Sequence, residues 1–248
     1  MGCFVICDKN IVLKQDGSLT EFSDLQKIKD LNTFSDYFEE KAFDLKVLVL
    51  KSADKLPDEF KAITLREYYF NNPEDEAFFA FRAAGLANWR RTSKFCGVCG
   101  NPMENHKSLT ARKCPACGNL VFPRISPCII VMITKGDQVL LAKPADPSRD
   151  FYALIAGYIE SGESAEHAVA REVLEETGLK VKNIKYRGSQ GWPFPDQLMF
   201  GFTAEYDSGE IVIQKEELSD AQWFDRNNFP ASTPKPGSIA YKLINGLI

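Results

Sequence analysis

Three glutamates, Glu172, Glu175 and Glu176, are close enough in the sequence to share one face of a helix. At about 100° per residue, their side chains fall within an arc of about 100°. Like charges at this spacing destabilise a helix by a few tenths of a kcal/mol per pair unless a positive charge compensates them. Arg171 can pair with Glu175, whereas Glu172 is expected to lack a basic partner. The glutamates therefore predict a site for a divalent cation such as Mg²⁺, with a solvated acidic helix face as the alternative.

The element that must position these glutamates is a loop followed by a helix. Gly157 and Gly162 bracket the loop, and Ser164 is expected to cap a helix that starts at Ala165. Gly178 is expected to end that helix, because glycine readily adopts the left-handed conformation of a helix C-terminus. Apolar residues on another face of the same helix would pack it against a core.

Four cysteines form a second set of candidate metal ligands. Cys96 and Cys99 make one CxxC pair, and Cys114 and Cys117 make another after fourteen intervening residues. Two such pairs at this separation are typical of a zinc ribbon, in which four thiolates surround Zn²⁺ tetrahedrally. A closed set of four cysteines leaves no open coordination position, so we expect the zinc to be structural and His106 not to be a ligand. Disulfide pairing is the alternative, and it would require an oxidising compartment.

The complete spacing around the glutamates resembles a known family motif. Gly157 is followed by five residues, Glu163, seven residues and the run Arg171–Leu179, REVLEETGL. This arrangement resembles the Nudix box, GX5EX7REUXEEXGU with U a bulky aliphatic residue, at every specified position. The resemblance implies an enzyme that hydrolyses a nucleoside diphosphate linked to another group. It also implies a fold of the α/β class, an α/β/α sandwich built on a mixed sheet.

Length and composition limit the class of protein. The 248 residues provide room for about two domains, and 44% hydrophobic and 26% charged residues are ordinary for a globular protein. No apolar run approaches the roughly 18 residues of a membrane span, and the first residues do not form a secretory signal. Cys3, Cys7 and Cys128 lie in apolar surroundings typical of reduced thiols. We therefore expect a cytoplasmic protein with no membrane segment.

We expect three regions along the chain: an α+β N-terminal domain over residues 1–92, the zinc ribbon over 93–124 and the Nudix hydrolase domain over 125–248. The first region should contain a hairpin, a further strand and a helix with Asn72 as its N-cap. The third region should contain buried strands, a further strand at Ile211–Ile213 and a closing helix from about Ser238. The strand patterns lie at Phe4–Cys7, Ile11–Leu13, Leu45–Leu50, Cys128–Ile133, Val139–Leu141, Tyr152–Ala156, Val181–Tyr186 and Leu198–Tyr206.

A second signature follows the Nudix box. The stretch Ser189–Met199, SQGWPFPDQLM, resembles the SQPWPFPxSLM signature of the NADH pyrophosphatase branch, which also carries an N-terminal domain and a zinc ribbon in this order. Two residues depart from the signature, because Gly191 stands where the pattern has Pro and Gln197 where it has Ser. Leu109 also occupies a ribbon position where the family is expected to have an acidic residue. The departures concern substrate preference more than the reaction.

The resemblance implies roles for individual residues. Glu163 and Arg171 would organise the catalytic loop, with Glu163 orienting Arg171. The expected Mg²⁺ or Mn²⁺ ligands are the carbonyl of Ala156 and the side chains of Glu172, Glu175, Glu176 and Glu217. Phe122 and Tyr158 would sandwich the nicotinamide, although either ring could instead fill the sheet face. The rest of the substrate site would be formed by Gln190, Gly191, Trp192, Pro193, Phe194, Pro195, Asp196, Gln197, the backbone at Ala240 and, as a phosphate contact, Arg66.

The expected function is metal-dependent hydrolysis of the pyrophosphate bond of NAD(H), which yields AMP and nicotinamide mononucleotide. Members of this branch also remove NAD caps from RNA, and a basic segment offers positive charges for contact with RNA phosphates. A Nudix hydrolase of another dinucleotide, such as ADP-ribose or a diadenosine polyphosphate, is one alternative; a nucleotide-sensing module that binds nucleic acid is another. A homodimer is implied by the resemblance alone. The basic segment has a single acid, Glu104, among Arg82, Arg90, Arg91, Lys94, Lys107, Arg112, Lys113 and Arg124.

Overall fold

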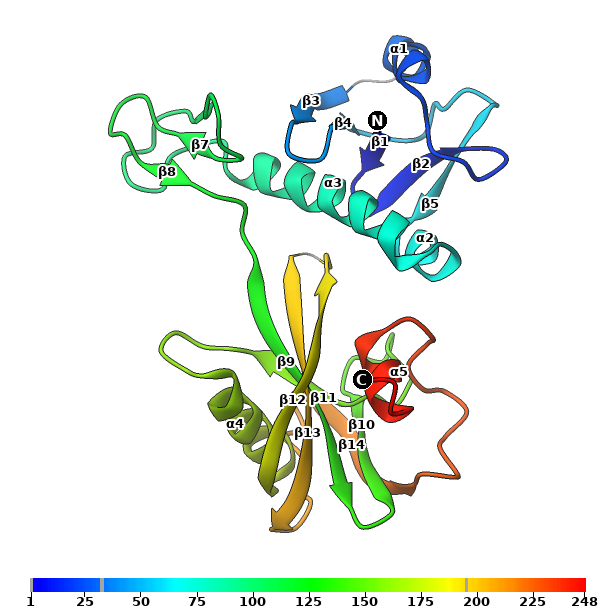
Figure 1. Cartoon of the computed structure of the whole chain (residues 1–248), viewed down its shortest axis with the longest axis vertical. Coiled ribbons are helices and arrows are strands. Elements are labelled where there is room, and N and C mark those ends of the chain that lie inside the picture. The colour runs from blue at the N-terminus through cyan, green and yellow to red at the C-terminus, as the bar shows by residue number, and fades with distance from the viewer. Residues whose placement is uncertain (1, 32–33, 195) are drawn as a thin grey trace. The chain divides into compact units, whose positions relative to one another are not determined.

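The structure is a computed structural model that describes residues 2–31, 34–194 and 196–248 (Figure 1). The chain forms two compact units. The first comprises Met1–Arg124 and Pro193–Asp196, and the second comprises Ile125–Trp192 and Gln197–Ile248. No helix of the described residues is long and apolar enough to cross a membrane.

The first unit contains a five-stranded sheet with strand order β3-β4-β1-β2-β5. Strands β1 and β4 are parallel, and the other neighbours are antiparallel. The strands are β1 Gly2–Cys7, β2 Asn10–Lys14, β3 Phe34–Glu40, β4 Leu45–Leu50 and β5 Phe60–Thr64, and the helices are α1 Phe22–Leu31, α2 Leu65–Asn71 and α3 Glu74–Thr92.

Both faces of this sheet are covered. Because side chains alternate along a strand, Phe4 and Ile6 of β1 point into a core shared with α2 and α3. Val5 points to the other face and packs with Leu25 and Ile28 of α1. Figure 1 accordingly shows α1 and α3 on opposite sides of the sheet.

The zinc ribbon belongs to the first unit and follows α3. It has a three-stranded sheet and a small core of Cys96, Met103 and Cys114. Its strands are β6 Glu104–Asn105, β7 Arg112–Lys113 and β8 Leu120–Val121.

The second unit contains a six-stranded mixed sheet with strand order β12-β13-β9-β10-β14, and β11 also pairs with β9. Strands β13 and β9 are parallel, and the remaining pairs are antiparallel. The strands are β9 Ser126–Lys135, β10 Gln138–Pro144, β11 Ile155–Tyr158, β12 Lys180–Trp192, β13 Gln197–Ser208 and β14 Leu218–Asp225, and the helices are α4 Ala165–Thr177 and α5 Ile239–Ile244.

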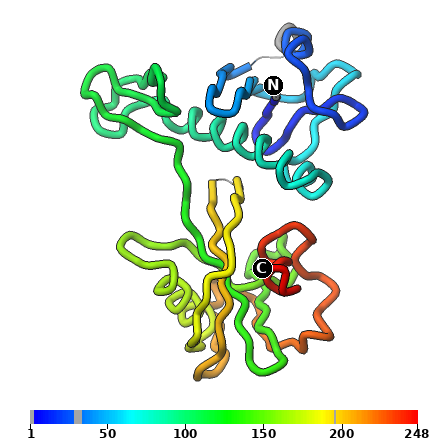
Figure 2. Tube along the Cα trace, in the orientation of Figure 1, coloured from blue at the N-terminus to red at the C-terminus, as the bar shows by residue number. Residues whose placement is uncertain are grey.

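The sheet of the second unit lies between two helices. Ile129 and Val131 of β9 pack with Val169 of α4, whereas Cys128 packs with Leu243 of α5. Fully burying one such aliphatic side chain contributes about 1.5–3 kcal/mol. Figure 2 traces the irregular residues 226–238, in orange to red, which lead from β14 to α5. The α/β/α sandwich with a mixed sheet is therefore confirmed.

Several expected elements differ from the structure in their bounds. The strand expected at Tyr152–Ala156 starts at Ile155, and Ala153 makes only an isolated bridge to Ala142. The prediction of a strand at Ile211–Ile213 was wrong, because these residues have no strand pairing. Instead, the Val212 amide donates a hydrogen bond to the Thr177 carbonyl at the C-terminal end of α4. Their apolar side chains pack against the α4 core, which explains a strand-like pattern without a strand.

The helix expected to begin after Asn72 begins one residue later than predicted. Pro73 is the N-cap of α3, and no side chain caps the helix. Asn72 instead ends α2, where its side-chain amide donates a hydrogen bond to the Tyr68 carbonyl at 2.7 Å. The prediction of Asn72 as an N-cap was wrong, because this residue is instead the C-cap of the preceding helix α2.

Candidate functional site

Helix α4 begins and ends where the sequence predicts. The Ser164 hydroxyl accepts a hydrogen bond from the His167 amide at 3.2 Å, so it caps the N-terminus. Gly178 ends the helix with a φ of 72°, a left-handed conformation that favours glycine. These two residues fix the length of the helix that carries the glutamates.

The three glutamates of α4 differ in burial. Glu172 is 8% exposed and Glu176 is 5% exposed, whereas the Glu175 side chain is 52% exposed. Burying a carboxylate is costly unless hydrogen bonds or positive charges compensate it. The contacts of Glu172 and Glu176 therefore decide what the site can bind.

Gly157 leaves the space that the Glu172 carboxylate occupies. It lies within β11, where it pairs with Ile129 of β9, one residue before the strand ends at Tyr158. A Cβ atom at residue 157 would lie 2.0 Å from the Glu172 Cδ. The first glycine of the motif therefore lets a carboxylate lie directly against the strand backbone.

Arg171 joins the carboxylates. Its Nε donates to Glu163 at 2.6 Å, and its Nη1 donates to both Glu172 and Glu175 at 2.9 Å. The prediction that Glu172 lacks a basic partner was wrong, because the planar guanidinium presents several N–H donors and reaches both carboxylates. Its Nη2 also donates to the Tyr158 carbonyl at 2.9 Å, which ties the helix to the end of β11.

Glu163 holds Arg171 in this position. Its hydrogen bond with Arg171, together with the backbone N–H of Glu160, lowers the pKa of Glu163 to about 2. Glu163 is therefore ionised throughout the physiological range, and its oxygens are occupied by Arg171.

Glu176 is the least compensated of the glutamates. In the described part of the chain it makes no salt bridge, and burial followed by the charges of Glu172, Glu217 and Glu175 raises its pKa to about 8. Glu217 is near because the segment before β14 is attached to α4. The Gln214 amide donates to the Glu176 carbonyl at 3.0 Å, and the Glu217 amide donates to the Gln214 carbonyl at 3.0 Å.

This cluster fits a divalent cation. Crowded carboxylate oxygens with too little positive charge are the ligands that Mg²⁺ and Mn²⁺ prefer. The candidate ligands from side chains are Glu172, Glu175, Glu176 and Glu217. Ala156 is exposed and immediately precedes Gly157 in β11, so its carbonyl is a further candidate.

Three predicted substrate residues of the second unit, Tyr158, Trp192 and Gln197, lie on the face of the sheet opposite α4. Tyr158 and Met199 both pair with Cys128 of β9, and Trp192 pairs with Gln197. Cys128, Met199 and Trp192 belong to the core that faces α5. The alternation of side chains places Tyr158 and Gln197 on this face too, and the Gln197 Nε2 donates to the Tyr158 hydroxyl at 2.9 Å.

Gln190 orients the start of α5. It is 6% exposed, its Oε1 accepts from the Ile239 amide at 2.7 Å, and its Nε2 donates to the Gly237 carbonyl at 2.9 Å. Both ends of its amide thus position the backbone next to Ala240. By contrast, a Cβ atom built at Gly191 would meet nothing within 4 Å.

Other predicted substrate residues belong to the first unit. The Phe194 ring lies 5.7 Å from the Phe81 ring, and the Arg66 guanidinium lies 5.4 Å from the Phe194 ring. Phe122 is 56% exposed. Pro193 is in the same unit, and Asp196 pairs with Arg124 at 3.6 Å, whereas Pro195 lies outside the described residues.

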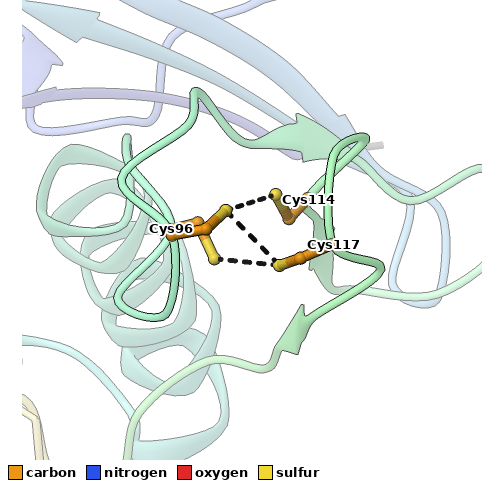
Figure 3. Close-up of side chains that lie close together, drawn as sticks. Cys96, Cys114 and Cys117 are labelled. Atoms are coloured by element: carbon orange, nitrogen blue, oxygen red, sulfur yellow. Dashed lines mark hydrogen bonds between the residues drawn. The ribbon is translucent and has the colours of Figure 1, made fainter.

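The four ribbon cysteines come together as the spacing predicts (Figure 3). Their Sγ atoms lie within 4.8 Å of one another. The Sγ of Cys99 lies 3.5 Å from those of Cys114 and Cys117, and Cys96 lies 3.6 Å from Cys117. These separations approach the edge of about 3.8 Å of a tetrahedron with zinc–sulfur distances of about 2.3 Å, and they exceed the disulfide bond of about 2.0 Å.

Backbone amides of the first CxxC pair favour the thiolate form of Cys96. The amides of Cys99 and Val98 hydrogen-bond the Cys96 sulfur and lower the pKa of Cys96 to about 6. Cys3, Cys7 and Cys128 are buried free thiols outside this cluster. The donor set therefore fits a structural Cys₄ zinc site.

Not all of the basic segment is available to a ligand. Arg82 pairs with Glu40 and Arg90 pairs with Asp36. The Arg112 Nη1 donates to the carbonyls of Arg90 and Ser93, at 2.9 and 3.2 Å, at the C-terminal end of α3. Sequence reasoning did not anticipate that Arg112 joins the ribbon to this helix. The exposed members of the segment are Arg91, Lys94, Lys107, Lys113 and Arg124.

Two family models match this chain. A family model described as the NUDIX domain matches residues 123–243, and one described as the NADH pyrophosphatase zinc ribbon domain matches residues 91–122. A crystal structure of a NUDIX hydrolase from Nitrosomonas europaea aligns with a TM-score of 0.47 at 24% identity, covering 55% of this chain and 80% of that one.

Curated relatives extend the match across both domains. Proteins named NAD-capped RNA hydrolase NudC from Salmonella typhi and Salmonella newport are each 47% identical over 169 residues, which is 68% of this chain and 65% of theirs. The match thus spans just under two thirds of the length of these relatives. With the complete box on α4 and the four ribbon thiols in contact, the chain belongs to the Nudix family and carries an NADH pyrophosphatase-type zinc ribbon.

Proposed function

We propose that the protein hydrolyses the pyrophosphate bond of NAD(H) to AMP and nicotinamide mononucleotide, in a reaction that depends on Mg²⁺ or Mn²⁺. The observation that carries the proposal is the buried carboxyl of Glu176, which makes no salt bridge in the described part of the chain and lies close to the carboxyls of Glu172 and Glu217. A solvated acidic helix face would leave these side chains exposed, whereas Glu172 and Glu176 are buried. The names of the relatives, which refer to NAD-capped RNA, support the choice of dinucleotide.

The residues have distinct tasks in this proposal. Glu172, Glu175, Glu176 and Glu217, with the Ala156 carbonyl, would hold the cations, which lower the pKa of a bound water and stabilise charge on the phosphates. Glu176 is our choice for the central ligand and general base. Arg171 and Glu163 keep the α4 carboxylates in place through the contacts described above.

Tyr158, Trp192 and the backbone at Ala240 would form the part of the substrate site that lies on the α5 face. Phe122 remains a candidate for the second side of the nicotinamide, and Gly191 and residues 193–197 remain candidates for the loop around it. Aromatic rings and short loops of this kind suit the recognition of flat rings by stacking.

The substrate is tested by a panel of dinucleotides. Purified protein with Mg²⁺ or Mn²⁺ is assayed against NADH, NAD⁺, ADP-ribose and diadenosine polyphosphates, and products are separated by chromatography. We expect the highest kcat/KM for NADH or NAD⁺, with AMP as one product. The highest value for diadenosine polyphosphates or ADP-ribose would favour the second candidate, which is motivated by the open backbone at Gly191 and by the longer side chain of Gln197.

We also propose that NAD-capped RNA is a substrate and that the ribbon contacts its phosphates. Lys107 and Lys113 are exposed and make no salt bridge in the described part of the chain. Charge reversal at both lysines should weaken binding of capped RNA and reduce its salt dependence, with turnover of NADH unchanged. Lys51→Glu, an exposed residue outside the ribbon, is the control; Arg112 is unsuitable because it caps α3. An equal loss of RNA binding in the ribbon variant and in the Lys51→Glu control would contradict an RNA site on the ribbon.

Two further properties belong to the proposal. The Cys₄ site suits a reducing compartment such as the cytoplasm, because thiolates must stay reduced to bind zinc. A homodimer is implied by the resemblance to the NADH pyrophosphatase branch, and light scattering of the purified protein tests it against the chain mass of 27.9 kDa.

A further inference from the structure

Gln197 is the residue at which this chain departs from the family signature and also makes a specific contact. The signature has serine there, whereas the Gln197 Nε2 donates to the Tyr158 hydroxyl at 2.9 Å. Gln197 pairs with Ser126 of β9, and Tyr158 pairs with Cys128, so the contact spans β9 diagonally. A serine side chain is too short to cross a strand, because neighbouring strands lie about 4.8 Å apart.

Tyr158 is held at both ends. Arg171 donates to its carbonyl at 2.9 Å, and Gln197 donates to its hydroxyl at 2.9 Å. Its ring is nevertheless 50% exposed. An exposed ring normally samples several rotamers, and losing that freedom on binding costs conformational entropy. The hydrogen bond from Gln197 to the hydroxyl restricts this freedom in advance, while the bond from Arg171 fixes the backbone of Tyr158.

We propose that Gln197 is a positioning residue that fixes the Tyr158 ring as a preformed stacking surface. It thereby favours dinucleotides that carry an aromatic ring on the half opposite AMP over those, such as ADP-ribose, that carry none. This inference rests on the proposed function, because it assumes that substrate binds at Tyr158. Arg171, which binds Glu163, Glu172 and Glu175, also donates to the backbone carbonyl of Tyr158, so the residue that carries the ring is hydrogen-bonded to the same arginine as the carboxylates.

The test compares the ratio of kcat/KM for NADH to kcat/KM for ADP-ribose in a set of variants. Gln197→Ser should lower the ratio about two- to tenfold, the range expected for one hydrogen bond, mainly through KM for NADH. Tyr158→Phe should lower it by a similar factor, and the double variant should be no worse than Tyr158→Phe alone, because both changes remove the same contact.

Two further variants separate positioning from general damage. Gln197→Glu keeps the length of the side chain and can accept a hydrogen bond from the Tyr158 hydroxyl, so it should restore most of the ratio. Gln222→Ser removes a comparable contact in the same unit, since the Gln222 Nε2 donates to the Tyr152 hydroxyl at 3.4 Å, and it should leave the ratio at the wild-type value.

The outcomes distinguish this inference from the function on which it rests. Wild-type protein that hydrolyses ADP-ribose but not NADH would refute the proposed function, and this inference with it. Wild-type protein active on NADH, combined with a wild-type ratio in Gln197→Ser or with multiplying effects in the double variant, would overturn this inference alone.

Discussion

The cysteine cluster of the ribbon and the carboxylate cluster of α4 gather metal ligands in different ways. The four thiols lie within 4.8 Å of one another and supply a full set of four zinc ligands. In the described part of the chain, no three carboxylates come together as tightly, and Arg171 occupies oxygens of Glu172 and Glu175. A complete ligand set suits a metal that holds the fold together, whereas an incomplete one leaves coordination positions for water and phosphate.

The largest effect is expected in the ribbon. Cys114 is fully buried, and Cys114→Ser should abolish zinc retention and unfold the ribbon, because structural zinc contributes on the order of 10 kcal/mol to the folding of small zinc domains. Zinc content and the dispersion of ribbon amide signals in NMR spectra check this. Cys7→Ala, which removes a free thiol outside the ribbon, should retain zinc. A ribbon that stays folded without zinc would contradict the view that the cysteine site serves the fold.

The next effect concerns turnover. Glu176→Gln removes the central carboxylate, so it should lower kcat for NADH about 10³-fold, while zinc content and the circular dichroism spectrum stay the same. Near-normal turnover of NADH would contradict catalysis by the carboxylates of α4.

Substitution of Gly157 should disturb the same cluster indirectly. Gly157→Ala places a methyl group 2.0 Å from the Glu172 Cδ, so the carboxylate must move, and we expect kcat to fall about 10²-fold. Gly188→Ala, also in the sheet of the second unit, brings a Cβ only to 3.6 Å from Ile248 and serves as the control. Similar activity of the two alanine variants would mean that Glu172 has room that the structure does not provide.

The last effect is on stability in the absence of divalent cations. The pKa of Glu176 is raised to about 8 from 4.5, so the folded state binds more protons than the unfolded state between these values. Metal-free wild-type protein should therefore lose stability as the pH rises from about 5 to 8. Glu176→Gln should be more stable than wild type by about 2–4 kcal/mol at pH 8 and equally stable at pH 5, measured by urea denaturation in EDTA. Equal stability of the two proteins at both pH values would show that the folded protein stabilises the ionised form of Glu176 as well as water does.

The sequence predicted most strongly those features that depend on local spacing. The bounds of α4 follow from Ser164 and Gly178, and the zinc cluster follows from two CxxC pairs. Both signals lie within a few residues of the atoms that they position, so no knowledge of distant contacts was needed.

Features that depend on distant partners could not be predicted in this way. Nothing near Gly157 in the sequence shows that Glu172 will fill its missing side chain, and Arg112 gives no sign that it caps α3. Likewise, nothing near Gln190 in the sequence shows that its amide holds the backbone of residues 237–239 at the start of α5. Each of these contacts joins segments that only the folded sheet or ribbon brings together.

The central claim is that the α4 carboxylates perform the chemistry while the ribbon zinc serves the fold. It is tested by measuring NADH turnover and bound zinc in the same sample, before and after a brief exposure to EDTA and again after addition of Mg²⁺. The account predicts that EDTA stops turnover at once while zinc stays bound, and that Mg²⁺ restores it. Turnover that survives EDTA, or that disappears only together with the zinc, would contradict it.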